Sequence, residues 1–144
     1  MHQDARQRLE ELLDREIEMA RALVSNLDQE KIALTGDSSA ALDEKLAEKM
    51  RLFDGMEKLE RQRRELLPNP GAPDLAATVV ARWRSLMSLM ASCRNANELN
   101  GHIIRVRQHQ IRQLIDVVRG RPTPLTYDPH GKTFAGALRA LAKA

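Results

Sequence analysis

The side chains best suited to chemistry in this chain are its histidines and its single cysteine, but their spacing is unfavourable. His102 and His109 are seven residues apart, which on a helix is two turns or ~10 Å, so one metal ion cannot be bound by both. Cys93 falls between Met90 and Asn97 in a helical pattern, where a buried small hydrophobic residue is more common than a reactive thiol. The sequence has no glycine-rich phosphate loop, nucleophile elbow or HExxH motif. We therefore expect no enzyme activity, no cofactor and no metal site.

A cluster of arginines raises the question of nucleic-acid binding, because arginine pairs with phosphate. The cluster consists of Arg94, Arg105, Arg107, Arg112, Arg119 and Arg121. Only Glu98 and Asp116 oppose it, but no aromatic side chain is interleaved for base stacking and no helix-turn-helix pattern occurs. We favour a solvated face, or pairing with acidic helices, and expect no nucleic acid. An acidic protein partner is a second interpretation, and a basic coiled-coil nucleic-acid-binding protein is the alternative function.

Charge is divided unequally along the 144 residues, whose net charge is +3. Residues 1–67 hold 12 Lys/Arg and 16 Asp/Glu, a net charge of −4, whereas residues 68–144 hold 11 Lys/Arg and 4 Asp/Glu, a net charge of +7. The two halves should attract each other. The overall positive charge is therefore weak support for a nucleic-acid partner.

The composition points to long helices and to the cytoplasm. Apolar residues make up 42% of the chain, but only one Trp, one Tyr and two Phe are among them. No apolar run approaches the ~20 residues of a membrane span, and charges within the first 25 residues exclude a secretory signal. A lone cysteine cannot form an internal disulfide. We expect a cytoplasmic protein without membrane insertion.

Apolar periodicity predicts two helices in the acidic half. Leucines and other apolar residues recur three or four apart over residues 4–34 and again over residues 40–67, as on one face of a helix. Gly36 and the serines that follow it would stop the first helix and cap the second. Prolines from Pro68 onward must end the second, because proline lacks an N–H donor.

A third, longer helix is predicted over residues 75–119, with Asp74 as its N-cap and Gly120 at its end. At 1.5 Å per residue it would be roughly 65 Å long. Its apolar steps of four and three are typical of a coiled-coil seam. The seam consists of Leu86, Met90, Cys93, Asn97, Asn100, Ile104, Arg107, Ile111, Leu114 and Val118.

These elements predict an all-α fold, an elongated antiparallel three-helix coiled-coil bundle with a long third helix. Residues 1–120 would form the helical domain. Residues 121–144 would be a flexible tail, because its prolines and glycines forbid a continuous helix, with one short amphipathic segment at its end. The apolar stripes could also pair between copies, so a homo-oligomer is possible.

Polar residues interrupt the predicted seam at Asn97, Asn100 and Arg107. Such residues can set helix register at a cost in stability, or they can mark a surface for a partner. Both interpretations stay open. Gly101 costs about 1 kcal/mol relative to Ala in a helix, so the helix could be continuous or hinged there.

Segments spread along the chain carry a family resemblance. They are Leu9-x-x-Leu12-Leu13-x-x-Glu16, the stretch from Glu48-Lys49 to Arg64-Glu65-Leu66-Leu67, and Asn97-x-x-Asn100-Gly101 with the turn from Tyr127 to Gly131. Together they resemble the FlgN family of flagellar export chaperones, which protect hook-associated proteins of the hook–filament junction before secretion. The resemblance covers roughly residues 5 to 135. Asp128 departs from it, since the family often has glycine there.

The resemblance implies a chaperone that covers a carboxy-terminal helix of a hook-associated protein, prevents premature assembly and delivers the protein to the export apparatus. Helix-in-groove recognition needs apolar residues at helical spacing. The client-binding residues that we expect are Ile104, Ile111, Leu114, Ile115 and Val118, with Phe134, Leu138 and Leu141 in the tail. Intramolecular packing is the alternative for both groups.

The resemblance also implies a role for the turn that follows the third helix. In the family, the tyrosine matching Tyr127 is expected to help dock the chaperone on the membrane export gate. Packing of this side chain against the bundle is the alternative. The residues that match the family motif are Asn97, Asn100, Gly101 and Gly131.

Overall fold

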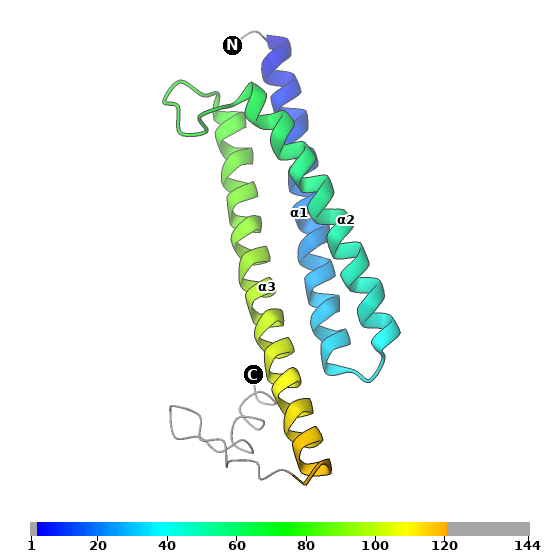
Figure 1. The fold of residues 1–144 in the computed structure, drawn as a ribbon. Coiled ribbons are helices and arrows are strands. Elements are labelled where there is room, and N and C mark those ends of the chain that lie inside the picture. The colour runs from blue at the N-terminus through cyan, green and yellow to red at the C-terminus, as the bar shows by residue number, and fades with distance from the viewer. Residues whose placement is uncertain (1–2, 121–144) are drawn as a thin grey trace. The chain divides into compact units, whose positions relative to one another are not determined.

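The computed structural model describes residues 3–120, in which α-helices are joined by two connections (Figure 1). α1 spans Gln3–Thr35, α2 spans Ser39–Leu66 and α3 spans Ala77–Val118. Each bound lies within two residues of the range that periodicity predicts. This part of the chain contains no strand, and the predicted all-α fold with a long third helix is confirmed.

The chain divides into two units, Met1–Ile104 and Arg105–Ala144. We call residues 3–104 the helical body, and residues 105–120, which include the last part of α3, the end segment. The expected boundary between a domain of residues 1–120 and a tail stays a prediction, because residues 121–144 lie outside the described residues.

Local signals fix the ends of α2. The side chain of Ser38 accepts a hydrogen bond from the backbone N–H of Ala41 at 3.2 Å and thereby caps the helix. At the other end, the N–H of Leu67 donates to the carbonyl of Arg63 at 2.7 Å. The next residue is Pro68, which has no N–H to continue the pattern.

α3 begins at Ala77, two residues later than expected. The carbonyl of Ala76 accepts the first turn's bonds from the N–H groups of Val79 and Val80, so Asp74 is not the N-cap. Leu75 and Ala76 pack against the apolar core before the helix starts. Packing of these two residues on the core therefore explains why the helix starts after them and not at Leu75.

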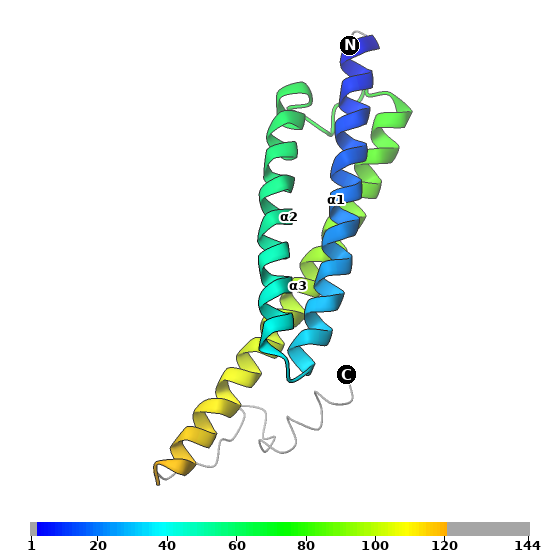
Figure 2. The same ribbon diagram turned by 90° about the vertical axis from the view of Figure 1, so that its right-hand side faces the viewer.

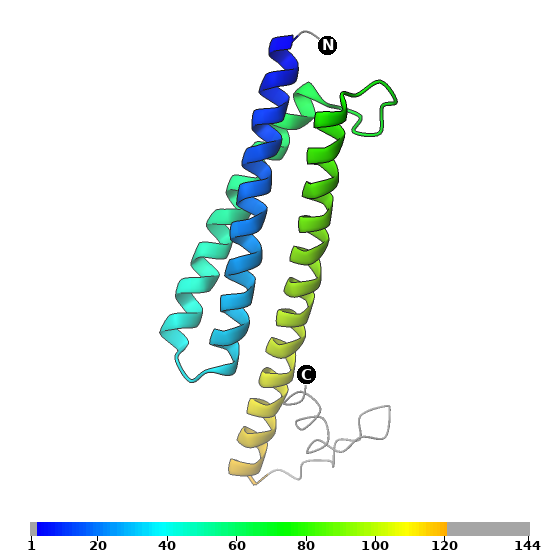
Figure 3. The same ribbon diagram turned by 180° about the vertical axis from the view of Figure 1, so that it is seen from behind.

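α1 is the central helix of the helical body, since α2 and α3 both pack against it (Figures 2 and 3). α2 runs antiparallel to α1, and α3 starts parallel to it. Of the described residues, eleven are buried in α1, three in α2 and four in α3. The buried residues of α1 are Leu9, Leu12, Leu13, Glu16, Ile17, Ala20, Leu23, Asn26, Leu27, Glu30 and Leu34. α1 is thus covered on two sides, while α2 and α3 are covered on one.

α1 and α2 approach each other closely. A β-carbon at Gly55 would lie 2.6 Å from the sulfur of Met19, so a larger residue would displace that side chain. Further along, the ammonium group of Lys49 lies 3.2 Å from the fully buried carboxylate of Glu30. The contact between the two helices therefore combines close packing of the Met19 side chain on Gly55 with a partly buried ion pair.

α3 packs on α1 at intervals of seven residues. Its buried side chains are Val79, Leu86, Cys93 and Asn100. This is the repeat of one position of a heptad, as in a coiled coil. Polar contacts flank it, because Thr78 donates to the carboxylate of Glu10 and Arg82 donates to Asp14 at 2.8 Å.

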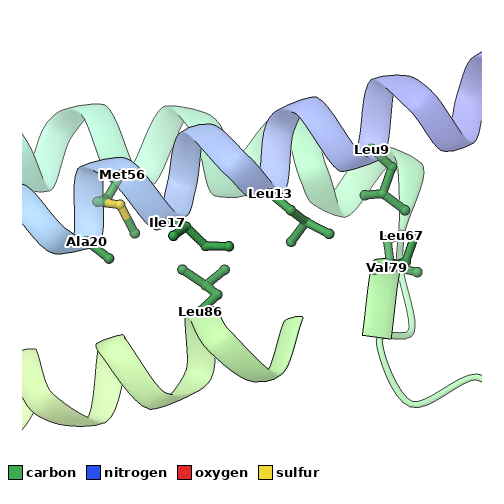
Figure 4. Packing of buried hydrophobic residues seen from close by; sticks show 8 residues of the cluster. All are labelled: Leu9, Leu13, Ile17, Ala20, Met56, Leu67, Val79 and Leu86. Carbon is green, nitrogen blue, oxygen red and sulfur yellow. The ribbon is translucent and has the colours of Figure 1, made fainter. Parts of the chain in front are cut away.

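The larger apolar core lies where α1 meets both neighbours (Figure 4). It consists of Leu9, Leu13, Ile17, Ala20, Met56, Leu67, Val79 and Leu86. Each fully buried leucine contributes roughly 1.5–3 kcal/mol relative to an exposed one. A smaller cluster of Leu23, Leu27 and Cys93 continues the packing along α1.

A buried ion pair joins the helices beside this core. The guanidinium of Arg63 in α2 donates to the carboxylate of Glu16 in α1 at 2.8 Å, and both side chains are buried. The same guanidinium lies 4.6 Å from the ring centroid of Trp83 in α3, within cation–π range. Burial raises the pKa of the Glu16 carboxyl, and Arg63 opposes that rise.

Breaking this pair on one side should destabilise the protein more than removing both charges. Arg63→Met should lower the free energy of unfolding by about 3 kcal/mol, because it leaves the Glu16 carboxylate buried without its partner. Glu16→Leu combined with Arg63→Met should recover most of that loss. Urea unfolding followed by circular dichroism measures both values. A double variant no more stable than Arg63→Met alone would contradict this account.

Candidate partner-binding surface

The apolar residues near the end of α3 are exposed. Of the side-chain positions predicted to bind a client, Ile111 is 55% exposed, Leu114 65%, Ile115 42% and Val118 86%. Ile104, at the end of the helical body, is only half-buried. Large apolar side chains that solvent reaches in this way are available to a partner.

These exposed residues share one face of the helix. Three apolar residues follow Ile111 at distances of three, four and seven positions: Leu114, Ile115 and Val118. This spacing is typical of a helix stripe that faces another helix. α3 is helical from Ala77 to Val118, so Gly101 lies inside the helix. Val117 is also exposed and lies beside Leu114, three residues away, at the edge of this stripe.

The end segment is strongly basic. Arg105, Arg107, Arg112 and Arg119 are exposed, and Asp116 is the acidic residue among residues 105–120. The apolar stripe is therefore flanked by positive charge, which favours an acidic partner surface.

The two motif asparagines, Asn97 and Asn100, lie in different environments. Asn100 is buried, and its side-chain amide donates to the carbonyl of Leu27 in α1 at 2.9 Å. Asn97 is exposed one turn earlier. Gly101 is half-buried within the helix. Asn100 thus has an internal packing role that fixes α3 against α1, and Asn97 is open to solvent.

Cys93 and the described histidines, His102 and His109, differ in burial. Cys93 is buried, its thiol lies 3.6 Å from the carbonyl of Ala20, and burial raises the pKa of that thiol. His102 and His109 are both exposed. Within residues 3–120, no three His, Cys, Asp or Glu side chains are grouped so that they could hold a metal ion. No helix in the same range is long and apolar enough to cross a membrane.

Several predicted site residues lie outside the described residues. They are the tail client contacts Phe134, Leu138 and Leu141, the docking residue Tyr127 and the motif residue Gly131. Their roles stay predictions.

The helical body contains a groove that was not predicted from the sequence. It has a volume of about 680 Å³ and lies between the last turns of α2 and the first half of α3. Met56, Trp83, Met87 and Met90 contribute to its apolar lining, with Arg94 at its edge. The α3 residues of the groove recur at spacings of four, three and four, from Trp83 through Met87 and Met90 to Arg94. This spacing places their side chains beside the face of α3 that is buried against α1, and it is the one sequence feature that points to the groove.

The two asparagines should respond oppositely to alanine. Asn100→Ala should lower the free energy of unfolding by about 1–2 kcal/mol, because it deletes a buried hydrogen bond and leaves a void. Asn97→Ala should be neutral or stabilising by about 0.5 kcal/mol, since alanine is the better helix former on an exposed face. Chemical denaturation of both variants measures the difference. Equal effects would show that the two residues share one role.

Comparison with known protein families supports the family resemblance of the sequence segments. The model of the family described as FlgN protein matches residues 1–134, nearly the whole chain. No curated protein and no solved structure matches the chain. The chain therefore belongs to the FlgN family, whose members are chaperones of flagellar export and not enzymes.

Proposed function

We propose that this chain is a cytoplasmic export chaperone for hook-associated flagellar proteins. It would bind a carboxy-terminal helix of such a protein, prevent premature assembly, and deliver the protein to the flagellar type III export apparatus. Family membership supports the general role. The observation that carries the client-binding part is the exposed apolar face of the end segment, formed by Ile111, Leu114, Ile115 and Val118.

The client would bind by helix-to-helix packing. An amphipathic client helix presents apolar residues at the same three- and four-residue spacing as the end segment, so the two stripes can interdigitate. Each side chain that becomes fully buried contributes roughly 1.5–3 kcal/mol before the cost of ordering the partners. Four such side chains give a moderate affinity, which suits a carrier that must release its client.

The remaining contacts are proposed from the family resemblance alone. Phe134, Leu138 and Leu141 would add client contacts from the tail, and Tyr127 would dock the chaperone on the export gate. No metal, nucleotide or other cofactor is needed for this cycle of capture and release.

Negative charge on the apolar stripe should weaken client binding without unfolding the chaperone. The double variant Ile111→Asp with Leu114→Asp should bind a hook-associated protein's carboxy-terminal helix at least about tenfold more weakly, because carboxylates would then be placed in an apolar contact. Co-purification and titration calorimetry with the full-length chain measure the loss. Both positions are exposed, so circular dichroism should show unchanged helix content.

His109→Asp is the matched control, since His109 is exposed and lies on the side of the same helix opposite to Ile111 and Leu114. It introduces a carboxylate into the same segment, but away from the apolar stripe. It should leave client affinity within about twofold of the wild-type value. Equal losses from the control and the double variant would argue against a contact through this face.

The exposed arginines of the end segment support a second candidate, a basic nucleic-acid-binding protein. That function requires binding to duplex DNA that weakens steeply with salt. The described aromatic residues, Phe53 and Trp83, both lie outside the end segment, so they offer no stacking platform there. A gel shift at low salt tests this alternative, and its absence would remove it.

A further inference from the structure

The groove of the helical body has its origin in the way α1 supports its neighbours. α2 is joined to α1 by the Arg63–Glu16 and Lys49–Glu30 ion pairs. α3 is joined to α1 through Arg82 and other contacts of its own. Because α2 and α3 each pack mainly on α1, side chains between α2 and α3 are incompletely covered. The groove of about 680 Å³ is the space between them.

Methionines give this groove its apolar surface. Met87 is 40% exposed, Met90 is half-buried, and Met56, which also lines the groove, is buried. Methionine side chains are flexible and polarizable, so they adapt to partner side chains of different shapes. Such surfaces are common where a protein accepts amphipathic helices.

The edge of the groove has an excess of positive charge. Glu16 and Arg63 neutralise each other inside, and Arg64 is paired with Glu60 at the edge. Arg94 is exposed, and no acidic side chain among the described residues lies within ion-pair distance of it. An apolar ligand that also carries a carboxylate would therefore find both a methionine surface and a cationic partner.

We infer that this groove binds an amphipathic helix of another protein, one with acidic residues beside its apolar stripe. A second copy of this chain is a poor occupant. Its exposed stripe, from Ile111 to Val118, is flanked by arginines, which would meet Arg94 with like charge. The acidic helix α1 has its own apolar face buried. The site lies wholly within the helical body, so the inference does not depend on the proposed client contacts of the end segment.

Trp83 provides a built-in reporter, because it is the one tryptophan of the sequence and lines the groove. The probes are two synthetic helical peptides of about 18 residues, or five turns. Both carry leucines at three- and four-residue spacing; one has glutamates beside the stripe and the other has lysines. Selective excitation of tryptophan in the full-length chain follows the titration of each peptide.

The glutamate peptide should give a saturable change in Trp83 emission and bind at least about tenfold more tightly than the lysine peptide. Arg94→Glu should reverse that preference. Met87→Glu, at an exposed position, should weaken the glutamate peptide at least about tenfold. Arg84→Glu is the matched control, since Arg84 is exposed on α3 but does not line the groove, and it should preserve the preference.

Three outcomes would overturn the inference. The first is no saturable emission change with the glutamate peptide, and the second is equal binding of both peptides with no effect of Arg94→Glu. The third is a concentration-dependent dimer, seen by light scattering, whose formation changes Trp83 emission without peptide; it would make a second copy the occupant. The variant Ile111→Asp with Leu114→Asp should bind the glutamate peptide as the wild type does. This separates failure of the groove from failure of the proposed client site.

Discussion

The contact between Glu16, Arg63 and Trp83 constrains the rest of the helical body, because it involves one residue from each of α1, α2 and α3. Arg63 must reach a buried carboxylate at 2.8 Å while its guanidinium lies over an indole ring. A buried charge without such a partner would be costly, so sliding any one helix along another by a turn is disfavoured. The apolar core beside it stabilises the fold but does not fix the register of the helices along one another, since leucines and methionines tolerate small shifts. The polar junction and the apolar core therefore act together.

Helix bounds could be predicted from the sequence because they depend on local signals. The prolines after Leu67, the serine cap before α2 and the three- and four-residue periodicity all act within a few residues. The one exception is the start of α3, where Leu75 and Ala76 are held by the distant core and no local pattern records that contact.

Which face of each helix is covered could not be predicted in the same way. The predicted seam of α3 advances in steps of three and four from Leu86 to Val118, but burial among the described residues follows only every seventh residue from Val79 to Asn100. Asn97 and Asn100 look equivalent in the sequence and differ in the structure, because only Asn100 faces the backbone of α1. The pairing of Glu16 with Arg63 joins residues 47 positions apart and likewise has no local signature. The groove follows from the same facts, since it depends on what remains uncovered after α1 has been packed on two sides.

The order of the helices in the chain has a consequence for folding. α1 and α2 are separated by a turn of a few residues, so their pairing closes a short loop, whereas the hydrogen bonds between α1 and α3 join residues 68 or 73 positions apart. Local contacts form faster than distant ones, so the hairpin of α1 and α2 should assemble first and α3 should dock last. During synthesis, one side of α1 then stays open to water until α3 has left the ribosome. A member of a family of export chaperones thus passes through a stage in which its own central helix is unshielded.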